Sequence, residues 1–161
     1  MIRDIRQRVE SKTLRGEGCW AWSGAHANTG YAQVRENKKL HYVHRLVYAF
    51  HNGSVPDGMV VDHKCHNRGC INPEHLQAVS PKQNNENRSG PARNNTSGYR
   101  GVYRITRSGK WGARLKDGPT VHREEGFATA AEAAKAASRM RATIFTNSLL
   151  DMHPAAPGDN D

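Results

Sequence analysis

The sequence has few apolar residues, few cysteines and no long hydrophobic run. Hydrophobic residues make up 36% of the 161 residues, and the mean hydropathy is −0.82, which is a thin supply of core for one compact unit. No run of about eighteen apolar residues is present, which excludes a transmembrane helix. The first six residues have no apolar stretch behind them, so we expect no secretory signal. We therefore expect two small lobes, at least one of them stabilised by something other than apolar burial.

Only three cysteines are present, Cys19, Cys65 and Cys70. An odd number without a secretory signal argues against a disulfide framework. Three thiols in a basic chain with nine histidines favour a metal site of the Cys3His type. The alternative is three unrelated buried thiols.

Positive charge is in excess, because 24 lysines and arginines against 15 aspartates and glutamates give a net charge of +9. The isoelectric point is near 9.8. Such a chain favours an acidic polymer as partner, most simply nucleic acid. A ribosome-associated or structural protein could carry the same charge, so charge alone does not identify the function.

Hydrophobic periodicity predicts mixed elements in the first half of the chain. We expect a short helix over residues 1–14, an aromatic strand over 19–22, a hairpin of 31–35 with 39–43, and a helix over 44–51. The segment that follows predicts a strand over 59–63, a loop over 64–74, a strand over 76–79 and a short polar helix over 81–88.

Metal-ligand residue types cluster in that second segment, in the order H-x-C-x4-C-x4-H. Cys65, Cys70 and His75 supply three ligands, and Cys19 can complete a tetrahedral zinc site. Zinc at this position would hold together a loop that has little material for regular structure, and would tie it to the aromatic strand.

His63 is left without a structural role, at the end of a strand. A histidine held by a backbone carbonyl on one ring nitrogen presents the other nitrogen as a general base near neutral pH. Asn84 offers a carbonyl oxygen and Asp62 a carboxylate, both of which suit Mg²⁺.

These motifs resemble a known family of nucleases. The sequence DHKCHNRGCINPEHL followed by QNNEN resembles the HNH nucleases, and its spacing is similar to that of the His-Cys box homing endonucleases. The upstream GCWAWSG, GYAQV, His44-Arg45 and PDGMVVDH resemble the segments before this ββα-metal finger in phage-type HNH proteins, so the resemblance covers about residues 1–90.

The resemblance implies a role for each matching residue. His63 matches the general base that activates water, and Asn84 matches the asparagine that binds the catalytic divalent ion. Asp62 matches a second metal ligand that only some HNH enzymes use. The resemblance favours the zinc-bearing variant, because His75 stands where many HNH motifs have an asparagine. An arginine should hold the scissile phosphate, and Arg35 and Arg45 are the candidates.

The segment after a polar linker at residues 89–97 has a different pattern of predicted secondary structure. Three strands are predicted over 99–105, 110–115 and 121–127, followed by a helix that opens with the capping box Thr129-x-x-Glu132. SGYRGVYR, GKWGARL and GFATAAEAAKAASRMRA resemble the plant ethylene-response-factor DNA-binding domain. The resemblance implies that the sheet meets DNA through Arg100, Tyr103, Arg104, Trp111 and Arg114. Alternatively, Tyr103 and Trp111 pack on the helix.

The sequence therefore predicts an α+β protein with a nuclease domain at 1–90, a linker at 91–97, a sheet-and-helix DNA-binding domain at 98–147 and a flexible tail at 148–161. We expect a Mg²⁺-dependent endonuclease with structural zinc, acting on double-stranded DNA as a monomer or homodimer, and most simply a site-specific homing endonuclease. The expected location is the cytoplasm of a bacterial or phage-infected cell, at the nucleoid and without membrane contact. The alternatives are a non-catalytic zinc-containing DNA-binding regulator and a less specific phage genome-processing nuclease.

Overall fold

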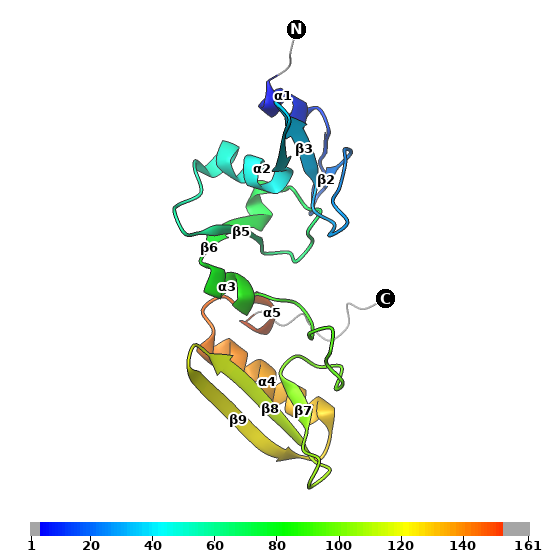
Figure 1. Ribbon diagram of the computed structural model, residues 1–161, viewed down its shortest axis with the longest axis vertical. Coiled ribbons are helices and arrows are strands. Elements are labelled where there is room, and N and C mark those ends of the chain that lie inside the picture. The colour runs from blue at the N-terminus through cyan, green and yellow to red at the C-terminus, as the bar shows by residue number, and fades with distance from the viewer. Residues whose placement is uncertain (1–3, 153–161) are drawn as a thin grey trace. The chain divides into compact units, whose positions relative to one another are not determined.

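The computed structural model describes residues 4–152, in two compact units, Met1–Asn84 and Asn85–Asp161 (Figure 1). The predicted boundary lies later, at residues 90–97. Residues 85–90 belong to the second unit because Glu86 is 3% exposed there. Its carboxylate accepts hydrogen bonds from the backbone N–H groups of Thr146 and Asn147, at 2.9 and 3.2 Å.

The first unit begins with a helix that is shorter than predicted. Helix α1 (Ile5–Glu10) is followed by strand β1 (Thr13–Leu14), which pairs antiparallel with β2 (Ala21–Trp22). The helix stops because the Val9 carbonyl accepts both the Lys12 N–H and the Thr13 hydroxyl, while the Lys12 carbonyl accepts from Ser23. The predicted aromatic strand is therefore one half of a small ribbon.

A hairpin and a helix follow, close to their predicted bounds. Strand β3 (Gln33–Glu36) pairs with β4 (Lys39–Tyr42), and helix α2 (Val43–Asn52) starts directly after it. Asn37 and Lys38 between the strands both have positive φ, 45° and 64°. Two such residues are typical of the tight turn that matches strand twist.

The remaining elements of the first unit have the order strand, loop, strand, helix. Strand β5 (Val60–His63) pairs with β6 (Leu76–Val79), and helix α3 (Pro81–Glu86) begins two residues later. The long loop between the strands ends in one turn of 3-10 helix, η1 (Pro73–His75). The predicted order is thus confirmed, with α3 running across the boundary between the two units.

The second unit is a three-stranded sheet with a helix on one face (Figure 1). The strand order is β7 (Val102–Arg104), β8 (Trp111–Asp117) and β9 (Thr120–Phe127), all antiparallel. Helix α4 (Ala130–Ile144) packs its buried alanines, 133, 136 and 137, against the sheet. The predicted capping box of Thr129 and Glu132 is present, with both of its hydrogen bonds.

The end of the described chain is packed rather than extended. A short helix, α5 (Leu149–Met152), lies within the segment predicted as a flexible tail, and residues 153–161 of that segment lie outside the described residues. Asp151 bonds the Arg141 guanidinium at 2.7 and 2.8 Å, and Ser148 is 1% exposed. None of the helices in residues 4–152 is long and apolar enough to span a bilayer.

Candidate metal centre and nuclease site

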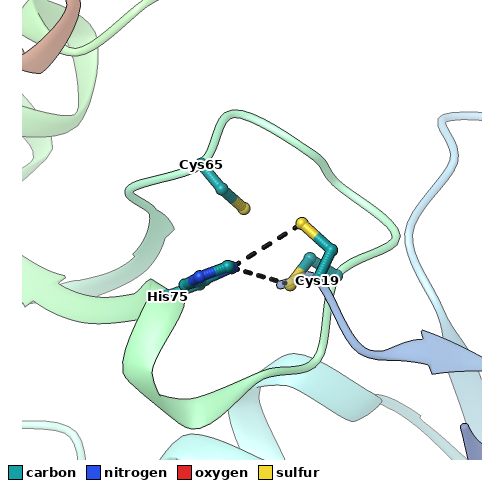
Figure 2. Close-up of side chains that lie close together, drawn as sticks. Cys19, Cys65 and His75 are labelled. Atoms are coloured by element: carbon teal, nitrogen blue, oxygen red, sulfur yellow. Dashed lines mark hydrogen bonds between the residues drawn. The ribbon is translucent and has the colours of Figure 1, made fainter. Parts of the chain in front are cut away.

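The four predicted zinc ligands converge in the first unit (Figure 2). The ligand atoms of Cys19, Cys65, Cys70 and His75 all lie within 4.8 Å of one another. His75 Nδ1 is 3.6 Å from Cys19 Sγ and 3.5 Å from Cys70 Sγ. Zinc bonds of about 2.3 Å to sulfur and 2.0 Å to nitrogen in a tetrahedron place such atoms about 3.5 Å apart. The donor set and its spacing therefore fit a closed tetrahedral zinc site.

Local backbone contacts position these ligands from segments far apart in the chain. The Asn72 side chain donates to the Gly18 carbonyl at 2.8 Å and accepts from the Glu74 N–H at 3.0 Å, which caps η1. The Ile71 N–H donates to the Trp20 carbonyl at 3.0 Å. Cys19 is thereby held beside the loop, and Asn72 shapes that loop through both of its side-chain hydrogen bonds.

Burial keeps the thiols of Cys65 and Cys70 protonated when no metal is bound. Burial raises the pKa of Cys65 to about 12, and burial also raises the pKa of Cys70. The neighbouring cysteines act in the same direction, because each added thiolate repels the next. A divalent cation reverses this effect, since it coordinates the thiolate. The cluster is therefore suited to binding a metal rather than to nucleophilic chemistry.

His63 is buried at the end of β5, with 5% of its surface exposed. Its Nε2 lies 3.0 Å from the Cys70 carbonyl oxygen, which is the kind of backbone partner that the sequence predicted. A carbonyl can only accept, so Nε2 carries the proton and Nδ1 holds the lone pair. Burial lowers the pKa of His63, and this outweighs the opposing effects of the Cys70 hydrogen bond and the Asp62 carboxylate. The ring is therefore neutral near pH 7.

A pocket of about 260 Å³ brings together several polar side chains of the first unit. Asn84 of α3 lines it together with Arg45 of α2, so one of the two candidate arginines shares a pocket with the expected metal ligand. Its lining residues are Tyr31, Tyr42, His44, Arg45, Val60, Val61 and Asn84.

The other predicted residues of this unit lie outside that lining. Arg35 is exposed on β3, and its carbonyl accepts from Arg8 at 2.8 Å. Asp62 accepts a hydrogen bond from the Gln77 side chain, its partner across the hairpin, at 3.1 Å. His63 adjoins the pocket through His44, whose ring centroid is 4.8 Å from its own.

Sequence reasoning missed His44 as a site residue. In the sequence, the pair His44-Arg45 carries no signal beyond the family resemblance. His44 and Val47 are buried on α2, one turn apart, which is the available signal that a polar residue occupies the inner face.

The DNA-contact residues predicted in the second unit have three different environments. Arg100 donates to the carbonyl oxygens of Asn85, Glu86 and Arg88 and lies 5.8 Å from the Phe145 ring centroid. The guanidinium is thus engaged within its own unit, and contact of Arg100 with DNA stays a prediction.

The two predicted aromatic contacts divide between the faces of the sheet. Trp111 packs against the core beside α4, with the Arg104 guanidinium 5.8 Å from its ring centroid. The Tyr103 ring lies against Gly112, and its hydroxyl donates to Glu125. The alternative that a ring packs on the helix side is therefore correct for Trp111.

Arg114 is the predicted residue that is exposed on the face away from α4. Its neighbours Ala113 and Leu115 are buried in the core, so strand alternation directs Arg114 outward. Arg123 of β9 stands directly opposite and is also exposed. Like charges directly opposite destabilise a sheet, so this pair is suited to an anionic partner. Sequence reasoning missed Arg123, because only the strand register reveals the pairing.

Most of the residues that line the pocket lie in a segment that matches a known family. Residues 41–86 match the family model described as HNH endonuclease, a range that includes β5, β6 and α3. These residues are thus similar to an HNH endonuclease domain. No solved structure matches the chain.

The chain is also similar to proteins of two phages. It is 38% identical over 84 residues to "Protein 2.8" of Escherichia phage T7, covering 50% of this chain and 57% of that protein. It is 41% identical over 70 residues to "Protein 7.7" of the same phage, covering 44% and 54%. It is 50% identical over 50 residues to the "Uncharacterized gene 5.3 protein" of Enterobacteria phage T3, covering 30% and 48%. The chain spans about half the length of these curated relatives.

Proposed function

We propose that this protein is a metal-dependent DNA endonuclease, in which the first unit hydrolyses a phosphodiester and the second unit binds the duplex. The observation that carries the proposal is the pocket of the HNH domain, where Asn84 and Arg45 meet beside the His44–His63 pair. An amide oxygen, a guanidinium and a neutral imidazole are the groups that phosphodiester hydrolysis needs at one place.

His63 is the general base in this mechanism. Its Nδ1 lone pair accepts a proton from water, and the water oxygen attacks phosphorus in line while the bond to the 3′ oxygen breaks. The Cys70 carbonyl holds the Nε2 proton and so fixes both the tautomer and the ring orientation. When bound by Asn84 and Asp62, a divalent ion such as Mg²⁺ would neutralise charge on the non-bridging and departing oxygens.

Arg45 holds the scissile phosphate. It lines the same pocket as Asn84, whereas Arg35 is absent from that lining and lies on β3. A guanidinium supplies charge-assisted hydrogen bonds to two phosphate oxygens, so it both orients the strand and stabilises charge that grows in the transition state.

Zinc at Cys19, Cys65, Cys70 and His75 has a structural role. The four side chains would fill all the positions of a tetrahedral ion and leave no open position for water. The proposed zinc therefore supports the loop whose Cys70 carbonyl orients His63, while the proposed catalytic cation is held elsewhere, by Asn84 and Asp62.

The second unit supplies contact with double-stranded DNA through the outer face of its sheet. Arg114 and Arg123 face outward together with Lys116, which is exposed on the same side of β8. The plant-type resemblance and this cluster of cations support the assignment. A DNA-binding unit joined to a nuclease unit favours a site-specific, homing-type enzyme. We expect it to act as a monomer or homodimer, at the nucleoid of an infected bacterial cell.

Plasmid nicking tests the proposal directly. Purified protein should convert supercoiled plasmid to nicked or linear DNA with Mg²⁺ and should fail to do so with EDTA. Binding without cleavage under both conditions would instead identify a zinc-containing DNA-binding regulator. One further alternative is a phage genome-processing nuclease of low specificity. Mapping of cut positions on a long DNA separates it from a homing enzyme, because dispersed cuts would exclude site specificity.

A further inference from the structure

His44 is a buried polar side chain to which the mechanism above gives no task. It lies in the first turn of α2 and is 5% exposed. Its ring centroid is 4.8 Å from that of His63 and 5.2 Å from that of Tyr31. Its Nδ1 is enclosed and has no hydrogen-bond partner among the described residues. A buried polar atom without a partner costs free energy, so its retention calls for an explanation.

The state of the ring follows from this enclosure. Burial lowers the pKa of His44 to about 3, with His63 and Arg45 acting in the same direction. The neutral imidazole has one N–H and one lone pair. An orphaned N–H costs more than an orphaned lone pair, so the enclosed Nδ1 is the bare nitrogen. Nε2 therefore carries the proton, and His44 is a hydrogen-bond donor on that side of the ring.

The pocket that His44 lines carries positive charge, as expected of a site for an anion. Among the described residues, Arg45 is the only charged one in the lining, and no carboxylate contributes to it. The hydroxyl-bearing Tyr31 and Tyr42 and the amide of Asn84 are the other polar groups. A site for a metal ion alone would be expected to contain a carboxylate instead. Hydrogen-bond donors around one guanidinium fit a phosphate group.

We propose that His44 contacts the scissile phosphate of the DNA strand, with its Nε2–H donating to a non-bridging oxygen beside Arg45. The inference rests on the proposed nuclease function and adds a substrate contact to it. The same ring packs against His63, so one side chain holds both the base and the phosphate that the activated water attacks. His44 thereby sets the distance between these two groups.

Two substitutions separate this contact from simple packing. His44→Phe keeps a flat ring against His63 and Tyr31 but removes the donor, whereas His44→Gln places an amide N–H near the position of Nε2. Loss of one donor to a developing anion lowers the rate by about 100-fold. His44→Phe should therefore retain zinc content and melting temperature and, at saturating enzyme, cut about 100-fold more slowly. His44→Gln should be faster than His44→Phe. The control is His51→Phe, at an exposed position of the same helix, which should cut at the parent rate.

Nuclear magnetic resonance of ¹⁵N-histidine tests the contact without cleavage. A short DNA duplex added in EDTA should shift the His44 Nε2 resonance, and Mg²⁺ alone should not. No shift with the duplex, or equal rates for His44→Phe and the parent, would overturn the phosphate contact. A shift with Mg²⁺ alone would make His44 a metal ligand and would also overturn it. If the parent does not cut DNA at all, the nuclease function fails, and the duplex titration still decides the phosphate contact.

Discussion

The Nε2 atom of His63 lies 3.0 Å from the carbonyl oxygen of Cys70. One residue thus presents its side chain to the metal cluster and its backbone to the candidate base. The Cys70 thiol lies 3.5 Å from His75 Nδ1, so the position of this carbonyl depends on the same loop that the cluster holds. Loss of the proposed structural metal should therefore remove activity as well as stability, although no residue of the cluster has a part in the proposed reaction.

Cys70→Ser tests this coupling. The purified parent should contain about one zinc per chain, and the variant should lose it because a hydroxyl is a poor ligand in a thiolate site. We expect the variant to lose both the thermal transition of the first unit and DNA cleavage, and Mg²⁺ should restore neither. Elemental analysis, circular dichroism and plasmid nicking measure the three effects.

His26→Ala is the matched control, because His26 is an exposed histidine outside the cluster. It should keep zinc, fold and activity. A metal-free parent with an unchanged melting curve would contradict the structural zinc.

His63→Ala should separate chemistry from folding. The variant lacks the proposed base but keeps all four cluster residues, so zinc content and duplex affinity should match the parent. The cleavage rate should fall by about 100-fold or more, the contribution of a general base. Single-turnover nicking at saturating enzyme measures the chemical step. Cleavage at the parent rate would exclude His63 as the base.

Arg45→Ala and Arg35→Ala form a matched pair. Arg45 lines the pocket with Asn84, whereas Arg35 does not. Removal of a charged hydrogen bond to the reacting phosphate costs about 1.5–3 kcal/mol, which corresponds to a cleavage rate about 10- to 100-fold lower for Arg45→Ala. Arg35→Ala should stay within about twofold of the parent. If Arg35→Ala instead cut more slowly than Arg45→Ala, the scissile phosphate would have to bind beside Arg35 on β3.

The Cys3His cluster is the part of the site that was most fully predictable from sequence. The residue types identify possible metal ligands, and Cys65, Cys70 and His75 are close enough in sequence for one loop to bring them together. Cys19 lies far upstream and was assigned only because a tetrahedral site needs a fourth ligand. Its sulfur does fall within the cluster, while the binding of zinc stays a prediction.

The roles of Arg100 and His44 were not predictable, because they depend on tertiary packing. The sequence does not distinguish an arginine that contacts DNA from one that donates hydrogen bonds to backbone carbonyls. Arg100 is engaged by carbonyls 12 to 15 residues away, and such contacts leave no pattern in the sequence. His44 became a site residue only through its proximity to His63, from a different element.

The Arg141–Asp151 pair predicts how the second unit responds to acid. Burial alone would raise the pKa of Asp151, but hydrogen bonds from Arg141, Ser148 and Ser138 outweigh it and lower that pKa. A carboxyl whose pKa is lowered on folding stabilises the protein above its unfolded pKa and loses this contribution as the pH falls through the folded value.

Asp151→Asn should consequently destabilise the second unit by about 3 kcal/mol at pH 7, the cost of leaving one member of a buried pair without its partner. The difference from the parent should shrink as the pH falls below the unfolded value of about 3.9, because the parent carboxyl then becomes protonated too. Urea unfolding over a pH series measures it. Equal stability at pH 7 would show that residues 149–152 are not part of the folded unit.

The facing pair Arg114 and Arg123 predicts a change in the salt dependence of DNA binding. Binding of each phosphate releases counterions, so the slope of log affinity against log salt should flatten by about one unit for each phosphate that a variant no longer binds. If either arginine reads a base edge instead, its removal should cost about 1–3 kcal/mol and relax preference at one position. Arg114→Ala, Arg123→Ala and the double variant should be compared on target and random duplexes over a salt series.

The sheet itself should tolerate these changes, because removal of either member relieves repulsion between like charges directly opposite each other. Both single variants should therefore melt at or above the parent temperature while they bind DNA more weakly. Arg100→Ala provides the contrast, because its guanidinium holds backbone carbonyls inside the unit and its removal should lower the melting temperature. Unchanged affinity and salt slope in the double variant would exclude this face of the sheet as the DNA-binding surface.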